Sequence, residues 1–461
     1  MTAAAPPPRT LLRGLGPWAS ASIVVGTIIG TGVFLKAAVM AQLGGSPLWV
    51  LAAWGVAGLL SFTGAMTYAE LGGMFPASGG EYVYLRHGYG PFMAYLYGWI
   101  RFWIGAPGSI AAYAVGSATF LATAVPLGRG EPVVAVGLVA TFTAINCLNV
   151  RSGGRLQTVL TALKLVMILG LAAGALTATR GSWSNFTRAE GGGFPGWGAF
   201  GAMVLAALWA YDGWNNLPMA AGEIRDPQRN LPRATVGGML AVLAIYALVN
   251  VGYFHALPMA DIAASRSSAF PHAPAVAANA AAQFLGGTAQ ALLAIAMTIS
   301  AMSAMNGSIL TGARVPFAVA RDGLAPAGLA RLSARARVPM TALIVQGAIA
   351  CALALSGSYD QLTDAVVFVS WLFYGLNAGS VLLLRRREPG RARPFRVPGF
   401  PVVPIVFIGL AVLLIANTIH SSPLPSALGL AVTAAGALVY VVFLRGKARP
   451  VEESAAPPEA R

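Results

Sequence analysis

The chain has 461 residues, of which 57% are hydrophobic and only 10% are charged, and its mean hydropathy is +0.69. A soluble domain of this length would carry more charge on its surface, so the composition indicates a polytopic, all-α membrane protein. The apolar runs are long and continuous, which excludes a β-barrel, whose strands would be short and alternating.

The formal net charge of +15 does not indicate a nucleic-acid partner. The basic residues lie in short loops between apolar runs, where such residues orient membrane helices. Cys147 and Cys351 both fall within apolar runs, so no disulfide framework is expected. Residues 1–17 are expected to form a cytoplasmic tail and not a signal peptide.

Twelve apolar segments are long enough to cross a bilayer, which takes about 20 residues. The predicted spans are 18–41, 47–74, 91–124, 133–150, 156–178, 198–222, 234–256, 287–313, 339–356, 362–384, 400–419 and 424–444. An even number of spans places both termini on one side of the bilayer.

The basic residues predict which side that is. With the N-terminus inside, only Lys36, Arg129, Arg180, Arg188 and Arg266 fall in outer loops, and almost all the other basic residues fall in inner ones. This bias predicts a cell-membrane protein with both termini in the cytoplasm, including a disordered tail at 445–461. Arg101 and Lys164 remain within spans, and the sequence suggests no partner for Arg101.

The first span carries three glycines in its middle, Gly26, Gly30 and Gly32. Each glycine weakens a helix by about 1 kcal/mol relative to alanine. Gly26 and Gly30 also form a Gly-x-x-x-Gly packing motif, which is the alternative explanation. Together with Gly32, they predict a break whose bared backbone must face protein or a polar cavity.

The sixth span contains a second interruption, in the stretch 207–216. Asp212, Asn215 and Asn216 are polar there, and Gly213 is a helix breaker. A charge at mid-membrane costs at least about 2.5 kcal/mol, so Asp212 is expected to face protein or a water-filled cavity. Broken helices at the start of 18–178 and of 198–384 predict two inverted repeats of five helices each.

The two breaks together predict a site for a zwitterionic amino acid. The N–H groups near Thr31, Gly32 and Val33 start the outer half of the first helix and can hold a carboxylate. The carbonyl groups near Ile28 and near Trp209–Asp212 end the inner halves and can accept bonds from an ammonium. The predicted substrate-binding residues are Ile28, Gly30, Thr31, Gly32, Val33, Trp209, Ala210, Tyr211 and Asp212.

Two of these residues have alternative explanations. Trp209 is expected to cover the substrate as a gate, although core packing would also account for it. Asp212 would also fit a structural hydrogen-bond acceptor near a helix end, in which case its carbonyl matters more than its carboxylate.

Several motifs resemble the amino acid–polyamine–organocation transporters. Val-Gly-Thr-Ile-Ile-Gly-Thr-Gly-Val-Phe (25–34) resembles their first-helix signature, and Phe-Pro-Ala-Ser-Gly-Gly-Glu-Tyr-Val-Tyr (75–84) their first inner loop. Residues 209–216 and 223–232 are most similar to the L-type amino acid exchanger branch, which residues 306–314 and 320–323 also fit. The resemblance implies the LeuT-type fold of five plus five inverted helices, with the two spans in 400–444 appended.

The resemblance also implies roles for single residues. It places carboxylate donors on Thr31 and Gly32 and ammonium acceptors on the carbonyls of Ile28, Trp209 and Asp212. In sodium-independent relatives a lysine at the position of Lys164 takes the place of a bound Na⁺. Lys164 would then bridge span one to Ser300 or Ser303 of span eight, with snorkelling to a span end as the alternative.

The resemblance implies a Na⁺-independent transporter that exchanges amino acids by alternating access. The small Ala210, the bulky Trp209 and Tyr211, and the lack of further acidic residues at the site favour a neutral L-amino acid. The alternative is an amino acid:proton symporter of the same fold, with Asp212, Lys164 or Glu223 as the coupling group. A cationic amino acid or a polyamine fits less well as the substrate. Relatives that bind a heavy chain carry a cysteine between spans three and four. The loop 125–132 has none, so we expect no covalently linked partner and a monomer or weak homo-oligomer.

An enzyme is not expected. Four scattered histidines and two cysteines supply neither a nucleophile nor a metal constellation, so no catalytic residue, metal or cofactor is predicted. No segment is large enough for the output domain of a sensor, and nothing in the sequence indicates the filter ring of a channel.

Overall fold

The computed structural model describes residues 10–187, 193–267, 269–270, 272–356, 359–421 and 423–449, and in these ranges every regular element is helical. Residues 1–9 and 450–461, in the two expected tails, lie outside the described residues. The first half contains α1 (Pro17–Ile28), α2 (Gly32–Gly44), α3 (Pro47–Met74), α4 (Glu81–Tyr89), α5 (Pro91–Ile100), η1 (Arg101–Gly105), α6 (Ala106–Ala122), η2 (Gly128–Gly130), α7 (Glu131–Leu148), α8 (Val150–Leu176) and η3 (Trp183–Phe186).

The second half begins with α9 (Trp197–Ala210), α10 (Asn216–Met219), η4 (Ala221–Glu223), α11 (Pro227–Ala256), α12 (Met259–Ala263), α13 (Val276–Leu285), η5 (Gly286–Thr288) and α14 (Ala289–Gly312). It ends with α15 (Arg314–Arg321), η6 (Ala327–Ala330), α16 (Met340–Ser356), α17 (Tyr359–Arg387), α18 (Val402–Ser421), α19 (Pro423–Val439) and η7 (Tyr440–Leu444).

Proline and glycine set many of the helix ends. Prolines occupy the first turn of α1, α3, α5, α6, α7 and α11, where the missing N–H has no intrahelical acceptor to lose. At the other end of α2, Gly45 adopts a left-handed conformation with φ 59°, which closes the helix. These prolines and glycines account for the close agreement between predicted spans and observed helices, as for the span 47–74 and the helix Pro47–Met74.

Nine helical stretches among the described residues are long and apolar enough to cross a membrane. The expected spans outside these nine coincide with the shorter apolar helices α9 and α16 and with the 29-residue α17. A helix therefore lies at each of the twelve predicted spans, and the number that crosses a bilayer remains a prediction.

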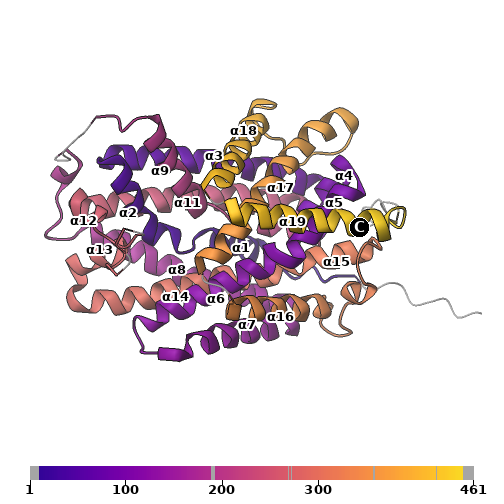
Figure 1. The fold of residues 1–461 in the computed structure, drawn as a ribbon, viewed down its shortest axis with the longest axis horizontal. Coiled ribbons are helices and arrows are strands. Elements are labelled where there is room, and N and C mark those ends of the chain that lie inside the picture. The colour runs from indigo at the N-terminus through magenta and orange to yellow at the C-terminus, as the bar shows by residue number, and fades with distance from the viewer. Residues whose placement is uncertain are drawn as a thin grey trace, which may run out of the picture.

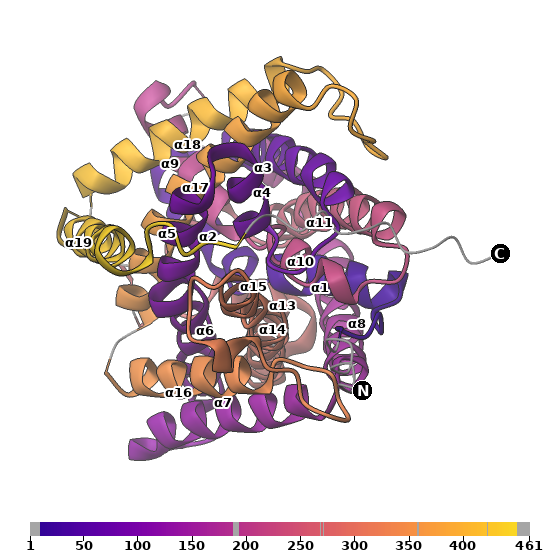
Figure 2. The same cartoon turned by 90° about the vertical axis from the view of Figure 1, so that its right-hand side faces the viewer.

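The first span forms the centre of the molecule. Its most apolar window is 78% buried inside the protein, against 28% for α18 and 17% for the last stretch, Ser426–Leu444. In Figures 1 and 2, α1 lies among longer helices, and it packs on α8, α11 and α14. Figure 2 shows α7 and α16 together at the lower edge, while α18 lies near the top and α19 at the left, both packed against α17.

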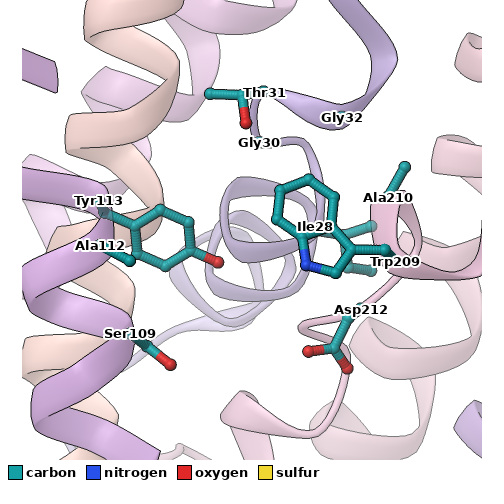
Figure 3. A pocket seen from close by; sticks show the side chains of 10 residues that line it. All are labelled: Ile28, Gly30, Thr31, Gly32, Ser109, Ala112, Tyr113, Trp209, Ala210 and Asp212. Atoms are coloured by element: carbon teal, nitrogen blue, oxygen red, sulfur yellow. The ribbon is translucent and has the colours of Figure 1, made fainter. Parts of the chain in front are cut away.

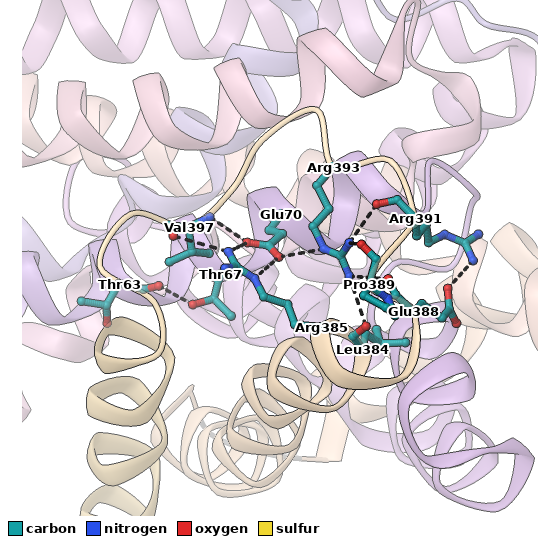
Figure 4. Close-up of polar contacts among 10 residues, drawn as sticks. All are labelled: Thr63, Thr67, Glu70, Leu384, Arg385, Glu388, Pro389, Arg391, Arg393 and Val397. Carbon is teal, nitrogen blue, oxygen red and sulfur yellow. Dashed lines mark hydrogen bonds and ion pairs between the residues drawn. The ribbon is translucent and has the colours of Figure 1, made fainter.

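A buried carboxylate fixes the connection between α17 and α18 (Figure 4). Glu70, near the end of α3, accepts two hydrogen bonds from Arg385 at 2.8 and 2.6 Å, and one from the Val397 N–H at 2.7 Å. Arg393 lies 3.5 Å from the same carboxylate. Such bidentate pairs combine strength with directional specificity, so Glu70 is structural at this helix end.

Candidate functional site

The first span is broken between Ile28 and Gly32, as its glycines predict. The Gly30 N–H turns back to the Ile28 carbonyl at 2.7 Å, and the helix restarts at Gly32. The last carbonyls of α1 and the first N–H groups of α2 therefore have no partner within their own helices. Gly26 lies inside α1, one turn before the break.

The sixth span is broken between Ala210 and Asn216, and Gly213 joins this break to the first one. Gly213 has φ +121°, and a Cβ there would lie 2.8 Å from the backbone carbonyl carbon of Thr27. The Thr27 hydroxyl lies 2.9 Å from the Gly213 carbonyl oxygen and 2.6 Å from that of Ile23 in its own helix. The two breaks are thus in direct contact, and only glycine permits that approach.

A small cavity of about 50 Å3 lies where the two breaks meet. Its lining residues come from both breaks and from α6, and are Ile28, Gly30, Thr31, Gly32, Ser109, Ala112, Tyr113, Trp209, Ala210 and Asp212. Figure 3 shows the rings of Tyr113 and Trp209 facing each other across it, with Ser109 and Asp212 at the opposite end from Thr31. The cavity holds only a few water molecules, so a larger ligand requires one of these rings to move.

The α6 residues were not predicted from the sequence. Ser109 and Tyr113 are four residues apart and therefore share one face of α6. Two polar side chains at that spacing in an apolar span were the available signal, but such pairs also arise by chance. Their position opposite Trp209 is a property of the packing.

Two predicted residues lie outside this lining. Tyr211 is buried, and its ring packs between Trp54 and Tyr246, with centroid distances of 5.7 and 4.9 Å. Val33 is buried in the apolar core beyond the first residue of α2. The side chains of both residues therefore contribute to packing. The prediction rested on the backbone groups that the breaks expose, and these do not reveal where a side chain points.

Tyr246 of α11 contacts the carbonyls expected to receive an ammonium. Its hydroxyl lies 2.9 Å from the Ala210 carbonyl oxygen and 3.2 Å from that of Ile28. A hydroxyl donates only one hydrogen, and the shorter distance favours Ala210. The Ile28 carbonyl, which also accepts from Gly30, then keeps one lone pair for a ligand.

Lys164 of α8 is buried and points its ammonium at the end of α1. It donates to the Gly26 carbonyl at 2.8 Å and also to the Ile29 carbonyl. The Ser300 hydroxyl of α14 lies 3.0 Å from the same Ile29 carbonyl oxygen and 3.2 Å from that of Gly30, and the shorter distance favours Ile29 as its acceptor. The ammonium and the hydroxyl thereby satisfy the carbonyls that the break leaves bare, which rules out snorkelling.

Lys164 was expected to bridge span one to Ser300 or Ser303 of span eight, and Ser300 is the serine that lies beside it at the break. Lys164 and Ser300 meet through the shared Ile29 carbonyl. Ser303 instead contacts Thr161 at 3.3 Å and Gln157 at 3.4 Å. The reason is geometric: three residues separate the two serines by most of a helical turn, so only Ser300 reaches the break.

Side chains of α8 bind the inner half of span one through a continuous polar network. Gln157 and Thr161 donate to the Ser22 carbonyl at 3.2 and 3.0 Å. Asn306 of α14 donates to Gln157 at 2.8 Å and accepts from Asn146 of α7 at 2.9 Å. All these groups are buried, and the bonds to the Ser22 carbonyl hold α1 on α8, while those of Asn306 hold α8 and α7 on α14.

Three charged residues, Arg101, Asp212 and Glu81, lie at or near the Asp212 end of the cavity. Arg101 in the π-helical turn η1 donates to Asn216 at 3.1 Å, which supplies the partner that the sequence did not suggest. The Asp212 carboxylate accepts from Tyr374 at 3.1 Å. Nearby, Glu81 of α4 accepts from Tyr68 at 2.7 Å and from Tyr97.

Burial raises the pKa of the Glu81 carboxyl, and the positive charge of Arg101 opposes this effect. Hydrogen bonds from Tyr97 and Tyr68 also favour the charged form, though less strongly. Glu81 lies in the short helix after span two, at the edge of the buried charges.

A buried ion pair lies on the side of the site opposite α2. The Arg314 guanidinium donates to both Glu223 oxygens, at 2.6 and 3.0 Å, and the side chain of neither residue is more than 1% exposed. It connects η4, which follows the broken sixth span, to the start of α15. Breaking such a pair leaves an uncompensated buried charge, which costs about 3–5 kcal/mol.

Comparison with known proteins identifies the family of the chain. The model of the amino acid permease family matches residues 15–444. The chain belongs to that family. The permease is therefore a multi-pass membrane transporter of amino acids and not an enzyme. Among the described residues, no group of three or more His, Cys, Asp and Glu side chains is placed to hold a metal ion.

Curated relatives of the permease cover almost the whole chain. It is 31% identical over 449 residues to the serine/threonine exchanger SteT of Bacillus subtilis (strain 168), covering 95% of this chain and 98% of that protein. It is 32% identical to the b(0,+)-type amino acid transporter 1 of Rattus norvegicus, over 91% and 85% of the two chains. It is 30% identical to the cystine/glutamate transporter of Homo sapiens, over 96% and 86%.

Proposed function

We propose that the permease exchanges neutral L-amino acids across the cell membrane without Na⁺. The independence from Na⁺ is inferred from Lys164, whose amino group binds the Gly26 and Ile29 carbonyls at the break. The Lys164 amino group fills the place between these carbonyl oxygens, which leaves no vacancy for a cation.

The substrate binds between the two broken helices. Its carboxylate receives the first N–H groups of α2, at Thr31, Gly32 and Val33, where the helix dipole is positive. Its ammonium takes the remaining lone pair of the Ile28 carbonyl and the carbonyls at Trp209 and Asp212. Its side chain extends toward Ser109 and Tyr113, which line the cavity from α6.

Closure over the substrate involves Trp209. Gly32 packs so tightly on the end of α9 that a Cβ there would lie 2.6 Å from the Ala210 Cβ. The Lys36 ammonium lies 5.0 Å from the centre of the Trp209 ring, as in a cation–π contact. Opening one side requires α2 and α9 to separate and Trp209 to turn away.

The alternation is a rocking of spans one, two, six and seven against the remaining helices, in two inverted repeats covering 18–178 and 198–384. Both termini lie in the cytoplasm, as the distribution of arginines indicates. The protein acts as a monomer or weak homo-oligomer without a covalently linked heavy chain, since the loop 125–132 between spans three and four contains no cysteine.

Counterflow in liposomes tests this proposal. The purified protein is reconstituted and loaded with one unlabelled amino acid at a time, and uptake of labelled amino acid is measured with and without Na⁺ and a pH gradient. We expect uptake only with an internal neutral amino acid, and no effect of Na⁺. Uptake that is independent of internal substrate and follows the pH gradient would instead establish the proton symporter, with Asp212, Lys164 or Glu223 as the coupling group.

A further inference from the structure

A second cavity, of about 320 Å3, lies where α7 ends and α8 begins. It shares no lining residue with the cavity between the two breaks. The residues that line it come from three separate segments, and are Leu12, Asn149, Val150, Arg151, Ser152, Arg155, Arg335 and Ala336.

The charge of this cavity is one-sided. The segments 10–16, 149–155 and 331–337 that supply its walls contain six arginines and no acidic residue. Three of these arginines, Arg151, Arg155 and Arg335, line the cavity itself. Within the described residues, the side chain of none of the three makes a hydrogen bond or an ion pair. Like charges that share a cavity repel one another, so an anion between them would be stabilised.

The backbone adds to this positive potential. Asn149 caps α8, and its side chain accepts the Ser152 N–H at 2.8 Å. Val150 and Arg151, in the same first turn, direct their N–H groups out of the helix end, where the dipole is positive. Guanidinium groups present paired N–H donors whose spacing matches phosphate oxygens. A hydrated metal ion or an apolar ligand would make no use of these donors.

We propose that this cavity binds the phosphate group of an anion, either a phospholipid headgroup or a soluble phosphate. The cavity lies at the ends of two predicted spans, the depth at which headgroups occur, and basic pockets between membrane helices are suited to them. The orientation of the helices in the membrane does not require basic residues to gather in a cavity. Arg229 and Arg233, at the start of α11, orient a helix equally well without lining either cavity.

A bound phosphate would connect the mobile and fixed parts of the permease. Leu12 lies just before α1, and the backbone of Leu15 pairs with that of Glu223 and Arg225 at 2.9 Å. Arg151 and Arg155 lie on the helix that carries Lys164. An anion held between these segments therefore stabilises their present arrangement.

The test uses the purified full-length protein in zwitterionic micelles. Thermal unfolding, followed by tryptophan fluorescence, and bound labelled ligand are measured with phosphatidylglycerol, phosphatidylcholine, or inorganic phosphate at constant ionic strength. The variant is R151Q/R155Q, and the charge-matched control is R229Q/R233Q, which has the same spacing on an exposed helix start. We expect phosphatidylglycerol, phosphate or both to raise the melting temperature of the wild type and the control.

In R151Q/R155Q the affinity should fall about 30-fold, from roughly 1 kcal/mol per arginine. A response to phosphatidylglycerol alone identifies a lipid headgroup, and a response to inorganic phosphate identifies a soluble source. Equal binding by R151Q/R155Q and the control overturns the proposal, as does a wild type that binds neither probe better than phosphatidylcholine. If R151Q/R155Q does not fold, R335Q in the connecting loop decides in the same assay. No transport is measured, so the outcome is independent of the proposed exchange.

Discussion

The glycines of the first span have two explanations, close helix packing and a break in the helix. A matched pair of variants at Gly26 and Gly30 separates them. A Cβ at Gly26 would lie 2.2 Å from Gln157 Nε2, 2.4 Å from Thr161 Oγ1 and 2.9 Å from Ser303 Oγ. A Cβ at Gly30 would meet nothing closer than the Ile28 carbonyl oxygen, at 3.9 Å. Gly26 thus provides the close helix contact, and Gly30 provides the flexible break.

The Gly26→Ala change forces α1 away from α8 and α14. Overpacking alone costs about 1–3 kcal/mol. Displacing Gln157 and Thr161 from the Ser22 carbonyl adds about 0.5–1.5 kcal/mol for each hydrogen bond lost. We therefore expect a loss of about 2–6 kcal/mol in the free energy of unfolding, because these terms combine to that range. Gly30→Ala should change it by less than about 1 kcal/mol.

The assay is thermal unfolding of the two purified variants beside the wild type, followed by counterflow of labelled amino acid. Gly26→Ala should have a lower melting temperature and no transport. Gly30→Ala should melt close to the wild type, so any loss of its transport reports on the break itself. Wild-type stability of Gly26→Ala, or equal destabilisation of both variants, would refute this assignment of the two glycines.

Four further predictions concern named contacts. Lys164→Ala leaves the Gly26 carbonyl without its donor and should reduce counterflow at least about tenfold, from roughly 1–3 kcal/mol for a buried unsatisfied group; unchanged kinetics would contradict its role. Tyr246→Phe removes the hydroxyl from Ala210 and Ile28 and should raise the KM for substrate more than it lowers the maximal rate, as initial uptake rates would show. Arg314→Gln should destabilise the protein by about 3–5 kcal/mol, and Glu223→Gln in the same background should recover part of this loss if the pair is the cause. Burial chiefly, and the charge of Arg391 next, lower the pKa of His87 to about 4. The folded state therefore keeps His87 neutral, and the free energy of unfolding should fall as the pH drops from about 6.5 toward 4. Melting curves taken across this range should show a weaker pH dependence for His87→Gln than for the wild type.

The sequence by itself determined the class of the protein and the positions of its helices. Span lengths follow from the bilayer thickness, and helix ends follow from proline and glycine, so both are local properties. The two breaks were also predictable, because Gly26–Gly32 and Asp212–Gly213 contradict the apolar helices around them. The family motifs gave Lys164 its place beside the first break.

Only the tertiary structure decided how those parts meet. Ser109 and Tyr113 complete the cavity from a span whose local sequence gives only a weak signal of function, a pair of polar side chains four residues apart. Tyr211 was predicted on the same grounds as Ala210, yet its ring turns into the core. Tyr246 and Ser300 reach the carbonyls of the breaks from helices far along the chain. Backbone exposure can be read from one segment, but the side chain that satisfies it depends on the packing of distant helices, which no single segment encodes.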